Sequence, residues 1–185
     1  MRTLHITLPF SEVDLKSVRA GDRLLLSGRM YTARDEAHRR IVQYKKEGAD
    51  LPINFQGETI YYVGPAPAKP GQVINSAGPT TAKRMDKYTQ DMLELGVVSM
   101  IGKGERGEET RQLLKGKAIY MAALGGVGAK QAQTILEQEE IAFHDAGMES
   151  LRRLEVKDFP VIVINDWQGN DAYELGRTQW TMSRQ

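Results

Sequence analysis

The stretch SAGPTTAKRMD brings together residue types that can bind an anion. Two adjacent threonines, Thr80 and Thr81, follow a Gly-Pro turn, and Lys83 and Arg84 follow them where a helix is predicted to begin. Helix N-termini carry partial positive charge and favour acidic residues, so two cations at this position need an explanation. In one interpretation, both cations lie in solvent and a following aspartate offsets them. In the other, free N–H groups, hydroxyls and a guanidinium converge on a carboxylate or phosphate.

The predicted start of this helix places Arg84 among free backbone N–H groups. With Thr81 as the N-cap, the threonine hydroxyl accepts a hydrogen bond from a first-turn N–H group. Arg84 is then the third helical residue, where its guanidinium opposes the helix dipole unless an anion completes the site.

A second candidate cation, Arg34, lies in the stretch YTARDEAHRR. Thr32 and Asp35 have the Ser/Thr-x-x-acid spacing of a capping box, which predicts a helix that begins directly after a strand and holds Arg34 in its first turn. Taken alone, Arg34 is more simply a solvated arginine on a charged helix face. His38 is a candidate acid or base in the same helix, although a partly buried structural histidine is the simpler interpretation.

The third candidate, Lys103, stands between two glycines at the end of an apolar strand in the stretch MIGKGERGEE. Glycines allow a sharp turn and the close approach of a ligand, whereas the simpler interpretation is a loop with an exposed lysine. Gly102, Gly104 and Gly107 also match the G-x-G-x-x-G pattern of dinucleotide-binding folds. We reject that match, because the next strand ends in two glycines where an acidic residue for the ribose is expected, and Glu105 would crowd a pyrophosphate.

All three candidate positions lie at strand-to-helix junctions. In open α/β sheets, ligands bind at the carboxyl ends of the strands. Cations at these ends without an acidic partner in sequence suit a small polyanion, and neither a carboxylate pair nor a nucleophile–histidine set stands out beside them. The chain therefore looks like half of an active site.

Composition excludes several classes of site. The 185 residues include no cysteine, which rules out disulfides, thiolate zinc sites, a cysteine nucleophile and a self-contained iron–sulfur cluster. The three histidines are far apart, so we expect no metal site. The formal net charge of +1 gives no basic field for nucleic acid or a membrane. We predict no signal peptide and no membrane-spanning run, and we expect a cytoplasmic protein.

The elements that must position these residues alternate between strand and helix in the middle of the chain. We expect strands at 4–9, 23–33 (hinged into a pair at Ser27-Gly28), 58–64, 72–77, 97–102, 117–124 and 159–166. Helices are expected at 34–48, 81–96, 107–116 and 126–138, with a helical turn or loop at 11–22. This alternation indicates right-handed crossovers and a largely parallel sheet, in a mixed layered α/β fold of one domain over residues 1–185.

The stretches INSAGPTTAKRMDKYT, GRMYTARDEAHRR and MIGKG resemble the class I fumarases. The sequence is most similar to the β subunit, or C-terminal domain, of the iron–sulfur fumarate hydratase and tartrate dehydratase family. The similarity extends over nearly the whole chain, as far as FPVIVINDWQGND, whereas we assign no counterpart in the family to the final ELGRTQWTMSRQ. The resemblance implies a swivelling β/β/α domain and a hydro-lyase that interconverts (S)-malate with fumarate and water.

The resemblance also implies a cofactor and a partner. In this family, cysteines of the α subunit or N-terminal domain hold a four-iron four-sulfur cluster, whose open iron acts as Lewis acid on the leaving hydroxyl. This chain would then be inactive alone and form an α2β2-like complex. Matched position by position, the family's substrate contacts fall on Arg34, Thr80, Thr81, Arg84 and Lys103. The cations would clamp the substrate carboxylates, and Thr80 falls on the family's proposed base, which needs a partner carboxylate at neutral pH.

Other interpretations remain open. On the same scaffold, an L-tartrate dehydratase or a related dicarboxylate hydro-lyase is the nearest alternative. From a different class, the chain would be a non-catalytic anion-binding or regulatory module. A nicotinamide-dependent oxidoreductase would require cofactor binding by the isolated chain.

Overall fold

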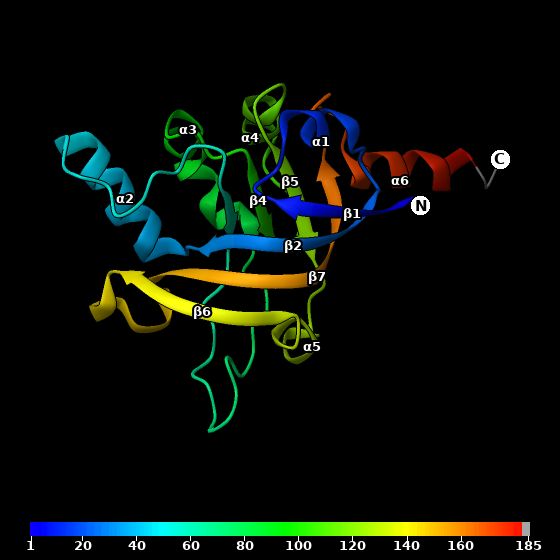
Figure 1. Cartoon of the computed structure of the whole chain (residues 1–185). Coiled ribbons are helices and arrows are strands. Elements are labelled where there is room, and N and C mark those ends of the chain that lie inside the picture. The colour runs from blue at the N-terminus through cyan, green and yellow to red at the C-terminus, as the bar shows by residue number, and fades with distance from the viewer. Residues whose placement is uncertain (183–185) are drawn as a thin grey trace.

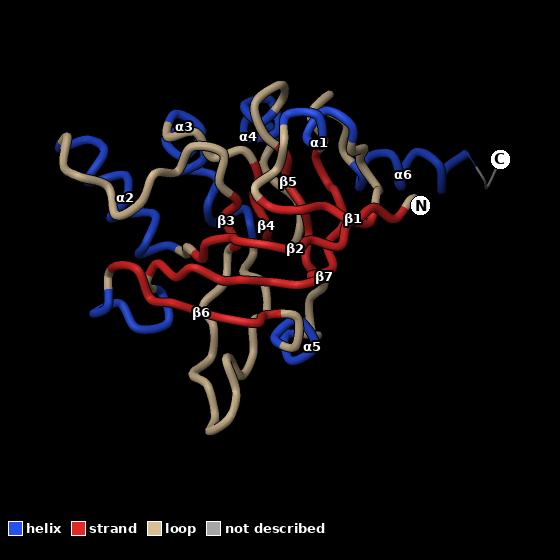
Figure 2. Tube along the Cα trace, in the orientation of Figure 1, coloured by secondary structure: helices blue, strands red, loops and turns tan. Residues whose placement is uncertain are grey.

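The computed structural model describes residues 1–182. Within them, seven strands form one sheet in the order β1-β2-β3-β4-β5-β7-β6 (Figures 1 and 2). The strands are β1 (Thr3–Leu8), β2 (Arg23–Thr32), β3 (Thr59–Tyr61), β4 (Ser99–Gly102), β5 (Ile119–Ala123), β6 (Ile135–Ala142) and β7 (Leu151–Asn165). The helices are α1 (Glu12–Ser17), α2 (Asp35–Glu47), α3 (Asp86–Glu94), α4 (Glu108–Leu114), α5 (Gly128–Ala132) and α6 (Ala172–Met182), with 3-10 turns η1 (Ala82–Met85) and η2 (His144–Glu149).

The sheet is mixed, as the sequence predicts. Strands β1 to β5 run parallel to one another, and β7 runs antiparallel to β2, β5 and β6. Because β7 pairs with both β2 and β5, the sheet closes on itself through β2-β3-β4-β5-β7. The parallel pairing of β2, β3 and β4 brings their carboxyl ends to one edge, where Arg34 and Lys103 follow.

Strand side chains alternate between two hydrophobic clusters, one on each face of the sheet. In β3 and the residues after it, Tyr61 and Val63 join the cluster that also contains Val161 of β7. Ile60 and Tyr62 point the other way and join the cluster beneath α2, α3 and α4, which lie along one side of the sheet in Figure 1. The sheet is therefore a packed layer that can hold the residues at its edge in place.

Residues 23–32 form a single strand rather than the expected hinged pair. Gly28, with φ of 113°, instead lies at a register shift in the pairing between β2 and β7. A Cβ atom at Gly28 would lie 2.6 Å from the carbonyl oxygen of Leu8, so this position requires glycine. The predicted helix at 34–48 is confirmed, and Gly48 ends α2 in the left-handed region.

Residues 72–77 do not form the predicted strand. They belong to a long loop between β3 and η1 that projects from the body of the molecule (tan, Figure 2). An isolated bridge joins Ala66 to Ser76 within this loop, and no neighbouring strand extends the pairing. Gly128 packs closely against the loop. A Cβ atom at this position would lie 2.6 Å from Ser76 Oγ and 2.9 Å from the nitrogen of Gly78.

The prediction of a helix at 126–138 is wrong for the second half of this range. Helix α5 ends at Ala132, and Ile135 begins β6, which pairs antiparallel with β7. Strand β7 itself begins at Leu151, earlier than the expected 159. Antiparallel pairing with the next strand, β7, has overridden the helix propensity of the Glu and Gln residues in β6.

Helix α6 covers most of the final stretch ELGRTQWTMSRQ, whose last three residues lie outside the described range. It contains no buried residue. Over residues 1–182, no helix combines the length and the apolar character needed to cross a bilayer.

Candidate functional site

Backbone hydrogen bonds hold the threonine pair at the carboxyl ends of β3 and β4. The N–H group of Thr80 donates to the carbonyl oxygen of Tyr62 at 2.7 Å, and that of Lys103 donates to Thr80 at 3.1 Å. The N–H group of Ala82 returns a hydrogen bond to Lys103 at 2.9 Å. Thr80, Thr81 and Lys103 are therefore neighbours at this edge of the sheet.

The glycines beside Lys103 have separate structural roles. A Cβ atom at Gly102 would lie 2.9 Å from the Tyr62 ring, 3.0 Å from Ala82 Cβ and 3.3 Å from the Thr80 oxygen, so Gly102 admits the threonine segment. Gly104 has φ of 76° and makes the sharp turn that the sequence predicts. The sequence predicts the close approach of a ligand to these glycines. At Gly102, the backbone that approaches closely is that of Thr80 in the same chain.

The start of the predicted helix at 81–96 differs from expectation. Thr81 is the N-cap of η1, but its hydroxyl makes no capping hydrogen bond, so the predicted threonine cap is wrong. Helix α3 begins only at Asp86, an acidic residue that suits the helix dipole. Lys83 and Arg84 thus lie in a short 3-10 turn that precedes the α-helix.

Several polar groups at the edge are free of partners. Within residues 1–182, the hydroxyls of Thr80 and Thr81 make no hydrogen bond and the ammonium group of Lys103 makes no ion pair. Thr81 and Lys103 are exposed, and Thr80 is half-buried. These groups are available to a ligand or to another chain.

An ion pair places Arg84 at the same edge as Arg34. The Nη2 atom of Arg84 lies 2.6 Å from Oδ2 of Asp35, which directly follows Arg34 and is the first residue of α2. Asp86 does not offset Arg84, because its carboxylate accepts hydrogen bonds from Arg106 Nε at 2.6 Å and from the N–H of Gly107 at 2.8 Å. The interpretation in which Asp86 neutralises the two cations is therefore wrong.

The predicted capping box at the start of α2 is also wrong. Thr32 Oγ1 accepts a hydrogen bond from the N–H of Arg152 at 3.2 Å and lies 3.4 Å from the oxygen of Ser150. Arg34 is the N-cap residue and makes no side-chain capping bond. The acceptor at this helix start is Glu149, whose Oε2 atom receives the N–H of Glu36 at 2.9 Å.

Arg34 is enclosed by residues from two other segments. Its Nη2 atom lies 3.2 Å from Oε1 of Glu149. A Cβ atom at Gly64 would lie 2.7 Å from its Nη1 atom, so the guanidinium packs directly on that glycine. Its Nε atom is buried and has no hydrogen-bond partner among residues 1–182.

His38 lies in the interior rather than at the edge. It is 1% exposed, its Nδ1 atom lies 2.8 Å from the carbonyl oxygen of Arg34, and its ring stacks on Tyr88. Burial lowers the pKa of His38 from 6.5 to about 4, so the ring is neutral at pH 7. These contacts fit the structural interpretation of this histidine.

The buried residue Arg106, which the sequence does not single out, connects the segments that carry the candidate residues. Its side chain is 0% exposed, and besides Asp86 it donates to Thr89 Oγ1 at 2.5 Å and to the Tyr62 hydroxyl at 3.3 Å. The backbone oxygen of Tyr62 accepts the N–H group of Thr80, and Asp86 directly follows η1. The Arg106 guanidinium therefore links its own loop to the segment after β3 and to the start of α3. The only local sequence signal for the role of Arg106 is that it is a cation in a glycine-rich loop. The sequence holds no local signal for the role of Glu149, because Glu149 lies 113 residues from its partner Glu36.

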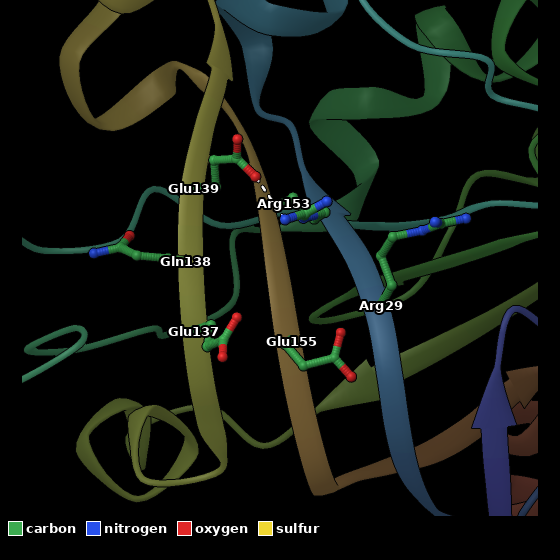
Figure 3. Close-up of a pocket in the computed structure, with 6 residues that line it drawn as sticks. All are labelled: Arg29, Glu137, Gln138, Glu139, Arg153 and Glu155. Carbon is green, nitrogen blue, oxygen red and sulfur yellow. Dashed lines mark ion pairs between the residues drawn. The ribbon is translucent and has the colours of Figure 1, made fainter.

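Two concave surfaces lie away from this edge. One, of about 430 Å³, lies on the neighbouring strands β2, β7 and β6 (Figure 3) and is lined by Arg29, Glu137, Gln138, Glu139, Arg153 and Glu155. Its charges are mixed, with Arg153 2.6 Å from Glu139. Another, of about 600 Å³, lies near Leu25, Leu124 and Pro160. None of the five candidate residues lines either hollow. Since Thr81, Arg84 and Lys103 are exposed, the candidate site is an open, cationic edge.

The residues of this chain do not fit an iron–sulfur cluster held by the chain itself. The sequence has no cysteine, and residues 1–182 contain no group of three or more His, Asp or Glu side chains placed to hold a metal ion. A cluster needs thiolate ligands, and none of these 185 residues supplies one.

Comparison with known proteins decides the family. The sequence model of the family described as Fumarase C-terminus matches residues 1–176. The chain belongs to this family. The resemblance inferred from the three motifs is thereby confirmed, and the match ends within α6, in the final stretch that the motifs left unassigned.

The relatives of the chain carry two kinds of name. A class I fumarate hydratase (anaerobic) of Escherichia coli K12 is 35% identical over 177 residues, which cover 92% of this chain and 32% of that protein. Fumarate hydratase 2 of Leishmania major is 35% identical over 185 residues, with the same coverage. A protein of Methanocaldococcus jannaschii named as L(+)-tartrate dehydratase subunit beta is 36% identical over 168 residues, which cover 87% of this chain and 86% of that protein. The chain thus spans about a third of the fumarate hydratases and most of a separate beta subunit.

Proposed function

We propose that this chain is the β subunit, or the corresponding C-terminal part, of an iron–sulfur hydro-lyase that interconverts (S)-malate and fumarate. The observation that carries the proposal is the cationic edge, where Arg34, Thr80, Thr81, Arg84 and Lys103 gather in a member of the Fumarase C-terminus family. The mixed sheet is compatible with the swivelling β/β/α domain that we propose for it.

The three cations bind the two carboxylates of the substrate in this proposal. Removal of the proton next to a carboxylate builds up a second negative charge on that carboxylate. Fixed guanidinium and ammonium groups stabilise this charge as it develops. Arg34, Arg84 and Lys103 supply these groups from three different segments of the chain, which suits a substrate with two carboxylates.

Thr80 is the proposed proton acceptor, and Thr81 donates a hydrogen bond beside it. A threonine hydroxyl is a poor base at neutral pH and needs an activating carboxylate. Since Thr80 has no carboxylate partner among residues 1–182, we infer that the activating group comes from the partner chain.

We further propose that a cysteine-bearing α subunit completes the site in an α2β2-like complex in the cytoplasm. That subunit would hold the four-iron four-sulfur cluster, which supplies Lewis-acid chemistry when bound. The lack of cysteine in this chain and the partner-free groups at its edge support a site shared between two chains.

The second candidate is an L-tartrate dehydratase β subunit, which the name of the Methanocaldococcus jannaschii relative favours. The two are separated by co-expressing the chain with its α subunit without oxygen and comparing turnover of malate, tartrate and a methylated dicarboxylate. Fumarate formation from malate, followed by ultraviolet absorbance, is the expected result. A higher kcat/KM for tartrate would favour the second candidate. A folded complex that dehydrates none of them, together with dicarboxylate binding by this chain alone, would favour a non-catalytic anion-binding module.

A further inference from the structure

We propose that Glu149 is a positioning residue that holds the Arg34 guanidinium in the orientation in which it binds the substrate carboxylate. The inference rests on the proposed function of the edge, because it assigns a task to a residue that supports Arg34. Glu149 lies at the end of η2, far from Arg34 in the sequence and in direct contact with it in the fold.

The two oxygens of Glu149 have different partners. Oε1 lies 3.2 Å from Arg34 Nη2, and Oε2 accepts the N–H of Glu36 in the first turn of α2 at 2.9 Å. A carboxylate at a helix N-terminus is favoured by the helix dipole and by the free N–H groups there. The helix therefore fixes Glu149, and Glu149 in turn fixes the residue that precedes the helix.

Gly64 closes the other side of the guanidinium. The contact with Gly64 lies at Nη1, whereas Glu149 binds at Nη2, so two sides of the planar group are constrained. The Nε atom is buried with no partner in the described part of the chain, and only 22% of the side chain is exposed. The orientation of the Arg34 guanidinium is therefore fixed by contacts within the chain itself.

This confinement has a consequence for substrate binding. An arginine that must be immobilised on binding weakens affinity through lost rotamer freedom, whereas a pre-oriented one does not. Glu149 should therefore act on KM more than on kcat. The opposite role, in which Glu149 competes with the substrate for Arg34, predicts that its removal lowers KM.

A second contact between η2 and α2 makes the test feasible. Asp145 accepts hydrogen bonds from Arg40 at 2.7 and 2.6 Å, so η2 remains tied to α2 when Glu149 is replaced. Asp145→Ala is also the matched control, since it removes an ion pair between the same two segments without touching Arg34. Circular dichroism and urea unfolding of each variant verify that the fold is kept.

The experiment measures malate kinetics of the assembled complex for Glu149→Ala, Glu149→Gln, Arg34→Ala and the Glu149→Ala/Arg34→Ala double variant. We expect Glu149→Ala to raise KM about 5- to 10-fold with kcat changed less than about 3-fold. Glu149→Gln, which can still accept the Glu36 N–H group, should raise KM less. In the Arg34→Ala background, Glu149→Ala should change nothing further, because a positioning residue acts only through its target. Asp145→Ala should leave KM near the wild-type value.

Three results overturn the inference, and they can be told apart. If Arg34→Ala lowers kcat/KM but Glu149→Ala leaves KM unchanged or lowers it, the role of Glu149 is wrong and the proposed function stands. An equal effect of Glu149→Ala with and without Arg34 would show a merely structural role. Wild-type kcat/KM in Arg34→Ala would overturn the proposed role of the edge, and the inference with it.

Discussion

Arg84 is the residue whose removal tests the proposed site most directly. It is half exposed, and an exposed ion pair such as the one it makes with Asp35 contributes only about 0–1 kcal/mol to stability. Arg84→Ala should therefore lower the free energy of unfolding by about 1 kcal/mol or less. In the reconstituted complex it should lower kcat/KM for malate about 100-fold or more, because a charge-assisted contact with a substrate carboxylate is lost.

The matched control for Arg84→Ala is Lys87→Ala. Lys87 is exposed, lies in the first turn of α3, and contacts the Tyr88 ring rather than any candidate residue. Its replacement should leave both kcat/KM and urea stability close to wild type. Near-normal turnover of malate by the Arg84 variant would remove Arg84 from the site.

His38 should make the fold less stable as the pH falls. Burial keeps its folded-state pKa at about 4, below the unfolded value of 6.5; the hydrogen bond to the Arg34 carbonyl and the charge of Asp35 oppose the shift, and Arg106 adds to it. Between these values the unfolded chain binds a proton that the native chain does not, so stability is complete above 6.5 and is lost as the pH falls toward 4. From about pH 7.5 to about pH 5, this loss amounts to about 2 kcal/mol.

Urea unfolding at the two pH values measures this loss, with His38→Phe as the comparison. Phenylalanine keeps an aromatic ring against Tyr62 and Tyr88 but cannot titrate. The pH-dependent loss should therefore shrink by about 2 kcal/mol in the variant, whatever its stability at neutral pH. The same pH dependence in both proteins would show that His38 is protonated equally in the folded and unfolded chains.

At the scale of elements, Arg106 should be a main support of the packing between α3 and the loop that connects β4 to α4. Its replacement by alanine leaves the Asp86 carboxylate without its cation and removes the hydrogen bonds to Thr89 and Tyr62. Breaking a buried ion pair on one side costs about 3–5 kcal/mol, so Arg106→Ala should lower the free energy of urea unfolding by that amount.

The control for Arg106→Ala is Arg39→Ala. Arg39 is 53% exposed and pairs with Glu36 on the surface of α2, so its loss should cost less than about 1 kcal/mol. Equal losses in the two variants would mean that Arg106 is not the buried brace that its contacts imply.

Predictions from the sequence succeeded where the deciding signals are local. The strand-to-helix junctions at Arg34 and Lys103 follow from apolar runs and glycines within a few residues, and parallel pairing then gathers them at one edge. The predictions from the sequence failed where a segment far away in the sequence determines the hydrogen bonds of a residue. Thr32 suits a capping box, but its hydroxyl binds Ser150 and Arg152 across the sheet.

Contacts that form only on folding also decide elements and the support of the site. The Glu-rich sequence of β6 favours a helix locally, yet antiparallel pairing with the next strand, β7, makes it a strand. Glu149 and Arg106 could not be assigned from the sequence, because their tasks arise only from contacts with residues brought close by the fold.

At the scale of the whole molecule, the proposal that this chain supplies only part of an active site rests on its open cationic edge and its lack of cysteine. Hydrophobic clusters on both faces of a closed sheet give the chain its own core. The chain purified alone should therefore unfold cooperatively in urea, retain no iron or sulfide after anaerobic reconstitution and desalting, and fail to dehydrate malate. Adding the cysteine-bearing subunit should restore turnover, which should rise until the two chains are present in equal amounts. Iron and sulfide that co-elute with the isolated chain, or malate turnover by it, would show that the site is not shared between two polypeptides.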